Sequence, residues 1–217
     1  KESQKEIPEF INKIVYESGN SFSFISKKNI KLPLFNGATE LNNEEFKVYL
    51  KNTGYNFKEN SKEKSGYTIL ENKKILLVMD VGSPPEKKFS KKYQCGCLSF
   101  EIISGNKKLI CNSGFYFKNK NKLNIISKST AAHSTLYINN QSSCSIKRRS
   151  FLNNNYNTEL FTSLNIKSKK ITTENEFDQI IASHDGYQKK FGIIHERKIK
   201  FLKKSKIFFG EDIITSS

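Results

Sequence analysis

The sequence contains no tryptophan, and only Arg148, Arg149 and Arg197 of its 37 basic residues are arginine. Tryptophan is the usual flat platform for a sugar ring, and arginine is favoured for planar, bidentate recognition of phosphates and bases. Hydrophobic runs are also short. The longest, residues 75–79, is the size of a buried strand and falls far below the ~20 apolar residues that span a bilayer. We therefore expect neither a nucleic-acid partner nor a membrane span.

The charge is strongly one-sided. The formal net charge is +16, and 37 − 3 = 34 of the basic residues are lysine. Lysine occurs here with abundant Asn, Ile and Ser, as in proteins from AT-rich genomes, and we attribute most of the excess to that bias. The charge still helps to attract a polyanion such as an acidic polysaccharide.

Four cysteines leave the redox compartment open. Cys95 and Cys97 are predicted to alternate on one face of a strand, and their C-x-C spacing differs from the C-x-x-C of zinc knuckles and redox loops. We expect buried free thiols. The alternative is a disulfide across adjacent strands, such as Cys97 with Cys111, in a periplasmic protein.

The N-terminal residues 1–20 differ from the rest. Apolar residues at helical spacing from Ile7 to Val15 predict an amphipathic helix, with Pro8 in its first turn and Gly19-Asn20 as its end. Its apolar face must pack either on the following domain or on a helical domain upstream. Lys1 is no native initiator, so we expect a piece of a longer protein.

From residue 21 onward the pattern is β. Short apolar or alternating runs are separated by Gly, Asn and Ser clusters, with hairpin turns expected at 104–106 and 139–141. One internal helix is expected at 42–52 and a proline-containing loop at 82–85. This predicts a large antiparallel β-sandwich. The expected strands are 21–25, 67–70, 74–80, 97–103, 107–112, 134–138, 160–166, 169–173, 177–183, 192–202 and 206–209.

Candidate chemical groups are few, because the sequence lacks a G-x-S-x-G elbow, a P-loop, H-E-x-x-H and a Rossmann fingerprint. His133 precedes the expected strand 134–138, and His184 precedes an Asp-Gly turn. His195 and Arg197 share one face of a strand, where they could bind a carboxylate or serve the fold alone. The residues by themselves identify no catalytic centre.

Several motifs occur in a fixed order, and together they resemble the C-terminal β-sandwich of the heparinase II/III family of polysaccharide lyases. They are Leu-Pro-Leu-Phe-Asn-Gly-Ala-Thr-Glu at 32–40, Asp-Val-Gly-Ser-Pro-Pro at 80–85, Leu-Ser-Phe-Glu at 98–101, Cys-Asn-Ser-Gly at 111–114, Ala-Ala-His-Ser-Thr-Leu at 131–136 and Ser-His-Asp-Gly-Tyr at 183–187. The last motif continues through 191–197 and 210–212 in a pattern of paired strands.

The resemblance implies a supersandwich-like domain at 21–217 that follows an (α/α) toroid, of which residues 1–20 would be the last helix. The toroid would be its partner in the same protein, with the site in the cleft between them. Family enzymes cleave uronate-containing glycans by β-elimination, in the periplasm or cell envelope of bacteria. The isolated domain would then be inactive. The alternative is a non-catalytic carbohydrate-binding or structural envelope-glycan module.

The resemblance also implies site residues. The positions of a family metal site match Gln94, Asn112 and His133, and because neutral amides are poor zinc ligands we expect a hydrogen-bonded cluster there, without metal or other cofactor. Lys92 stands at a family catalytic histidine, and Lys128 at a family arginine. The candidate catalytic residue is His133. The candidate substrate-binding residues are Lys92, Tyr93, Gln94, Asn112 and Lys128, and the residues for a structural or supporting role are His184, Tyr187, His195 and Arg197.

Overall fold

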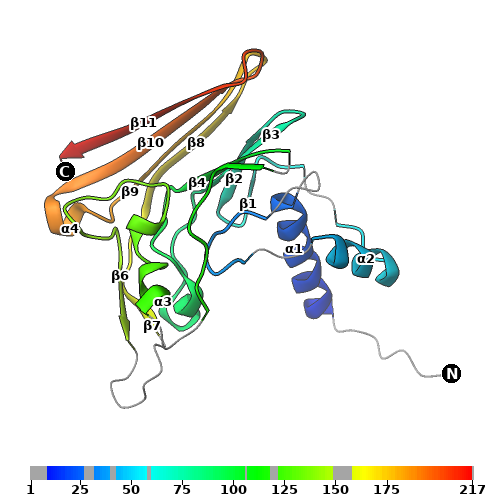
Figure 1. The fold of residues 1–217 in the computed structure, drawn as a ribbon, viewed down its shortest axis with the longest axis horizontal. Coiled ribbons are helices and arrows are strands. Elements are labelled where there is room, and N and C mark those ends of the chain that lie inside the picture. The colour runs from blue at the N-terminus through cyan, green and yellow to red at the C-terminus, as the bar shows by residue number, and fades with distance from the viewer. Residues whose placement is uncertain are drawn as a thin grey trace.

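A computed structural model describes residues 9–26, 32–39, 43–57, 60–105, 107–117, 122–148 and 158–216. Their strands are all antiparallel and form three sheets (Figure 1). The first contains, in order, β1 (Glu63–Lys64), β2 (Tyr67–Glu71), β3 (Ile75–Asp80), β4 (Phe100–Ser104) and β5 (Lys107–Ile110). The second contains β8 (Ile166–Thr173), β9 (Phe177–His184), β10 (Ile193–Leu202) and β11 (Ile207–Ser216) in the order β11-β10-β9-β8. A short pair, β6 (Ser145–Arg148) and β7 (Thr158–Thr162), forms the third.

The helices of the described residues are short apart from two near the N-terminus. These two are α1 (Glu9–Ile25) and α2 (Asn43–Thr53), and α2 confirms the helix expected at 42–52. The others are α3 (Lys122–Ile126), α4 (Gln188–Phe191) and the 3₁₀ helices η2 (Lys87–Lys92) and η3 (Thr130–Ala132). Within the described ranges, no helix is long and apolar enough to cross a membrane.

The two large sheets pack face to face around the main core. Leu77 and Met79 of β3 lie in this core with Ile180 of β9 and Phe201 of β10. Alternate residues of a strand point to opposite faces of its sheet. Leu76 and Val78 of β3 accordingly lie in a second core, on the other face of the first sheet, and this core contains Phe24 of α1. The first sheet is therefore buried on both faces, which explains why residues 75–79 are a continuous apolar run rather than an alternating one.

The end of α1 differs from its prediction. The helix continues through Gly19-Asn20 to Ile25, so the strand expected at 21–25 is wrong. Gly19 faces the ring of Phe57, and a Cβ at this position would lie 2.4 Å from ring carbons. The glycine thus allows close packing and does not end the helix. Pro8 lies outside the described residues.

One further strand prediction is wrong, and another, at 97–103, begins three residues too early. Residues 134–138 form no strand, and only an isolated bridge joins Ile138 to Gln141. The turn between them is as predicted: Asn139 and Asn140 have φ of 44° and 55°, and the Gln141 N–H donates to the Ile138 carbonyl at 2.8 Å. Residues 97–99 precede β4 in irregular backbone, so Cys95 and Cys97 do not alternate along a strand.

Candidate functional site

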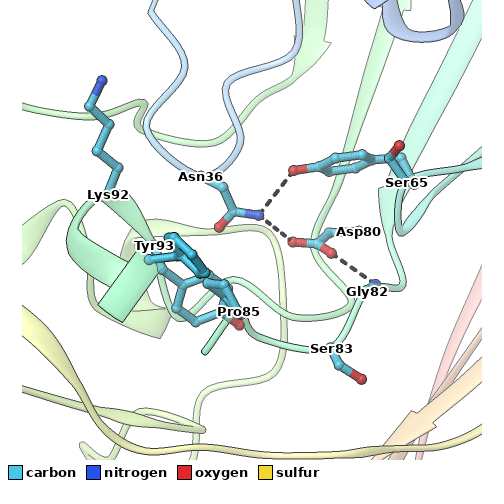
Figure 2. Close-up of a pocket in the computed structure, with 10 residues that line it drawn as sticks. Asn36, Ser65, Asp80, Gly82, Ser83, Pro85, Lys92 and Tyr93 are labelled. Atoms are coloured by element: carbon cyan, nitrogen blue, oxygen red, sulfur yellow. Dashed lines mark hydrogen bonds between the residues drawn. The ribbon is translucent and has the colours of Figure 1, made fainter. Parts of the chain in front are cut away.

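A polar cavity of about 200 Å³ lies beside the end of β3, where the chain leaves the first sheet (Figure 2). Segments far apart in the sequence meet there: the loop at 32–39, the β1–β2 turn, the loop after β3 and helix η2. The lining residues are Asn36, Ser65, Tyr67, Asp80, Gly82, Ser83, Pro85, Phe89, Lys92 and Tyr93. We call this the Asp80 pocket.

Asp80, the last residue of β3, is the acidic residue among those that line the pocket. Its residue is 4% exposed, and its carboxylate accepts hydrogen bonds from the Gly82 N–H at 3.1 Å and from the Asn36 amide at 3.0 Å. Burial raises its pKa to about 7, although both hydrogen bonds favour the ionised form. Asp80 can therefore gain or lose a proton near neutral pH.

Two tyrosines accompany Asp80. The Asn36 amide that donates to Asp80 also donates to the Tyr67 hydroxyl at 3.0 Å. Tyr93 is 5% exposed, and its hydroxyl has no hydrogen-bond partner among the described residues. Burial raises the pKa of both hydroxyls above the ordinary value, and the nearby Asp80 raises them further. Both tyrosines therefore stay protonated and can donate hydrogen bonds.

The rim of the pocket is basic and aromatic. Phe89 is 69% exposed, and the Lys88 ammonium lies 4.9 Å from the centre of its ring. Lys92 is exposed, and its side chain extends away from Asp80 (Figure 2). It passes close to Gly37, which has φ +89° and whose Cβ, if present, would lie 2.7 Å from the Lys92 Cβ. Gly37 thus suits both the backbone conformation and the space beside Lys92.

Gln94 follows the predicted pocket residues Lys92 and Tyr93 but lies inside the protein. Its amide nitrogen donates to the carbonyls of Gly114 at 2.9 Å and Ser127 at 2.6 Å. Its amide oxygen accepts the Gly37 N–H at 3.1 Å. These bonds join three loops, and through Gly37 they fix the backbone next to Asn36 of the pocket.

His133 and Asn112 are also buried. His133 is 9% exposed, and its Nδ1 bonds the Ser129 carbonyl at 2.8 Å, which places the proton on Nδ1. Its Nε2 has no partner among the described residues, and burial lowers its pKa. The Asn112 oxygen accepts the Ser134 N–H at 3.0 Å. Within the described ranges no hydrogen bond joins Gln94, Asn112 and His133, so the expected cluster is not formed.

The same bonds test whether zinc fits these three side chains. The oxygens of Gln94 and Asn112 are neutral amide oxygens that already accept backbone N–H groups, and His133 Nε2 is the one imidazole nitrogen of the three side chains without a partner among the described residues. Zinc sites use several imidazole, thiolate or carboxylate ligands. The donor set at this position does not suit zinc.

Lys128 lies away from the Asp80 pocket. Its ammonium donates to the Lys91 carbonyl at 2.8 Å and to the Thr158 hydroxyl, and it lies 5.2 Å from the centre of the Phe115 ring. Burial, with the nearby Lys91, lowers its pKa to about 8. Lys128 contributes to a second cavity of about 270 Å³, which Cys95 and Cys144 also line.

These two cysteines form a disulfide. Cys97 is buried and free, and Cys111 is exposed and free. The expectation of free thiols is therefore wrong for one pair, and the alternative pairing of Cys97 with Cys111 is also wrong. The bond links the irregular segment before β4 to the start of β6, a contact that strand alternation alone does not predict.

The residues expected to have a structural role gather on the second sheet. The Gly186 N–H donates to His184 Nδ1 at 3.0 Å, so His184 carries its proton on Nε2, which lies 3.2 Å from His195 Nδ1. His195 Nε2 then donates to Asp212 at 2.7 Å. Burial, with the nearby His195 ring as the second cause, lowers the pKa of His184 to about 3. The Tyr187 hydroxyl donates to the Leu136 carbonyl at 2.7 Å and holds the adjoining loop.

Arg197 completes this cluster, and it lies on the same face of β10 as His195, as predicted. Its guanidinium binds both oxygens of Asp212 at 2.7 and 2.8 Å and donates to the carbonyls of Leu98 and Ser134. Burial alone would raise the pKa of Asp212, but the hydrogen bonds from His195 and Arg197 outweigh it and hold the pKa well below its usual range. Sequence reasoning gave Asp212 no role, although the β10–β11 register places it directly opposite Arg197.

A family model described as heparinase II/III-like, C-terminal, matches residues 57–217. Among solved structures, the chain is similar to a heparinase III gene product, with 16% identity and a TM-score of 0.66 over 95% of this chain and 32% of that one. It is also similar to a mutant of the heparan sulfate lyase HepC from Pedobacter heparinus, with 16% identity and a TM-score of 0.60 over the same shares. The chain thus spans about a third of these structures. No curated protein matches it.

Proposed function

We propose that this chain, which belongs to the heparinase II/III-like family through its C-terminal domain, is the β-sandwich part of a polysaccharide lyase acting on uronate-containing, acidic glycans. The family membership and the antiparallel sandwich support a polysaccharide lyase-like domain. The observation that carries the finer proposal is the Asp80 pocket. It places a buried, titratable carboxyl and two tyrosine hydroxyls below a basic, aromatic rim.

β-Elimination has three requirements. The uronate carboxylate must be neutralised, the proton on C5 must go to a base, and the C4–O bond must break as the C4=C5 double bond forms. The departing oxygen then takes a proton. Lys92 at the rim supplies a positive charge for the carboxylate. Asp80, with a pKa of about 7, is suited to accept a proton at neutral pH, and the protonated tyrosines are suited to donate one.

The upstream partner remains part of this proposal. The first half of α1 exposes apolar side chains on one face, Phe10, Ile11 and Ile14, while its second half packs on the sheet. Exposed apolar patches of this kind mark interaction surfaces. They support the docking of a helical domain against α1, which would close the cleft above the sandwich. The Cys95–Cys144 disulfide supports a location in the cell envelope, because disulfides persist in oxidising compartments.

A glycan-binding module without turnover is the second candidate. It is supported by the position of His133, which lies buried and lines neither of the two cavities described. In this case Lys92 and the exposed aromatic side chains would bind an acidic glycan, and no proton transfer would follow.

The test uses the full-length protein and a panel of heparan sulfate, hyaluronan, alginate and polygalacturonate. A lyase generates unsaturated uronate ends, which appear as ultraviolet absorbance. The lyase proposal predicts turnover on at least one polymer and its loss in Asp80→Asn with glycan binding retained. Salt-sensitive binding without absorbance on any polymer establishes the binding module instead. Neither binding nor turnover on the panel refutes both.

A further inference from the structure

The Asp80 pocket has a polar floor and an apolar edge. Asp80, Asn36 and Tyr67 form a bonded polar group inside it. Phe89 also lines it, with most of its surface exposed, on the 3₁₀ helix that also carries Lys92. A large exposed aromatic side chain next to buried polar groups is typical of ligand sites, where few polar groups fix the orientation of a ligand against an apolar surface.

The Tyr93 hydroxyl is a second indication of a ligand. Tyr93 is almost completely buried, lines the cavity and leaves its hydroxyl without a hydrogen-bond partner among the described residues. Buried polar groups in native proteins are nearly always paired, and an unpaired one calls for an explanation. A polar ligand in the cavity, or the water it displaces, would provide the missing partner.

Size and chemistry narrow the class of ligand. A cavity of about 200 Å³ has room for a single sugar ring, and Lys92 among its lining residues supplies a cation for an anionic substituent. A pyranose ring offers hydroxyls for the floor and a face of C–H groups for an aromatic ring. We propose that the Asp80 pocket is a subsite for one acidic sugar ring, which stacks on Phe89 while Lys92 binds its anionic group.

This inference rests on the proposed function, because it names the position at which the acidic glycan is bound. It adds a specificity role for Phe89, a residue that takes no part in proton transfer. In a sequence without tryptophan, the phenylalanine ring supplies the flat platform. The Lys88 ammonium also lies beside the ring, but it pairs with Glu86 at 3.1 Å, so Lys92 is the cation that the proposal uses.

The experiment measures the affinity of the full-length protein for heparan sulfate and alginate tetrasaccharides by calorimetry, with cellotetraose as the neutral probe. Phe89→Ala removes the platform and is expected to weaken binding of an acidic tetrasaccharide about tenfold. Phe89→Tyr keeps the ring and is expected to restore the wild-type affinity. Lys92→Ala is expected to weaken binding of the acidic probes only and to reduce its dependence on salt.

Two matched controls lie outside the pocket. Phe209→Ala removes an exposed phenylalanine of β11, and Lys107→Ala removes an exposed lysine of β5; both are expected to bind as the wild type does. Wild-type affinity in Phe89→Ala and Lys92→Ala, with turnover or binding intact, overturns the subsite and leaves the proposed function standing. Absence of binding and turnover in the wild type refutes both.

Discussion

Replacement of Asp80 by asparagine should remove a large part of the pH dependence of folding. The carboxyl has a pKa of about 7 in the folded protein, against an ordinary value of 3.8. A raised acid pKa contributes stability that is fully present below about pH 4 and is lost as the pH rises through 7. A difference of about three in pKa corresponds to about 4 kcal/mol, of which roughly 2–3 kcal/mol falls between pH 5 and pH 8.

Asp80→Asn keeps the shape of the side chain and cannot titrate. Its amide offers one oxygen to two donors, the Gly82 N–H and the Asn36 amide, so one donor meets an NH₂ group instead. This mismatch costs about 1–3 kcal/mol at every pH. The variant should therefore be less stable than the wild type near pH 5, and its deficit should shrink or reverse near pH 8.

Urea unfolding at several pH values from about 5 to about 8 provides the measurement, with constant m-values as the check on two-state behaviour. Subtraction of the two free energies cancels the other titrating groups. Glu211→Gln, which alters an exposed carboxyl on β11, is the matched control for the removal of one carboxyl group. A flat difference between wild type and Asp80→Asn over this pH range would refute the reasoning that burial controls this carboxyl.

Three other outcomes are expected. His184, with a pKa lowered to about 3, contributes stability that is present above about pH 6.5 and lost as the pH falls. The wild type should therefore lose about 4 kcal/mol more of its free energy of unfolding than His184→Gln between pH 6.5 and pH 3. Arg197→Lys loses the bidentate contact with Asp212 and should lower the free energy of unfolding by about 2–4 kcal/mol in urea titrations. Reduction of the Cys95–Cys144 disulfide, whose cysteines are 49 residues apart, should lower the free energy of unfolding by about 4 kcal/mol. Cys144→Ser and the reduced wild type should therefore have the same melting temperature.

The local sequence pattern was sufficient to predict strands and the faces of their side chains where neighbouring strands are joined by short turns. The alternation from residue 192 to 202 placed His195 and Arg197 on one face, and the structure confirms this arrangement. Asp212 received no role because its register depends on the length of the β10–β11 turn, which alternation does not determine. The order of the motifs along the chain identifies residues 80–85, but it does not predict the hydrogen bond between Asp80 and Asn36, which lie 44 residues apart.

The errors have a common physical cause, which is contact between distant segments. Gly19 resembles a helix end until Phe57 is placed against it. Residues 134–138 alternate like a strand, yet the polar groups of Ser134 bond to Asn112, Phe100 and Arg197 instead of to a neighbouring strand. In both places tertiary packing outweighs local preference.

The position of α1 on the back of the first sheet has a practical meaning for anyone who shortens this protein. A cut at residue 20 passes through the helix and keeps Phe24 but removes the preceding turns that hold it in helical conformation against Leu76 and Val78. Recombinant fragments that start there should be less stable than fragments that retain the entire helix. For expression purposes, the smallest stable unit includes a helix that simple trimming to the strands would discard.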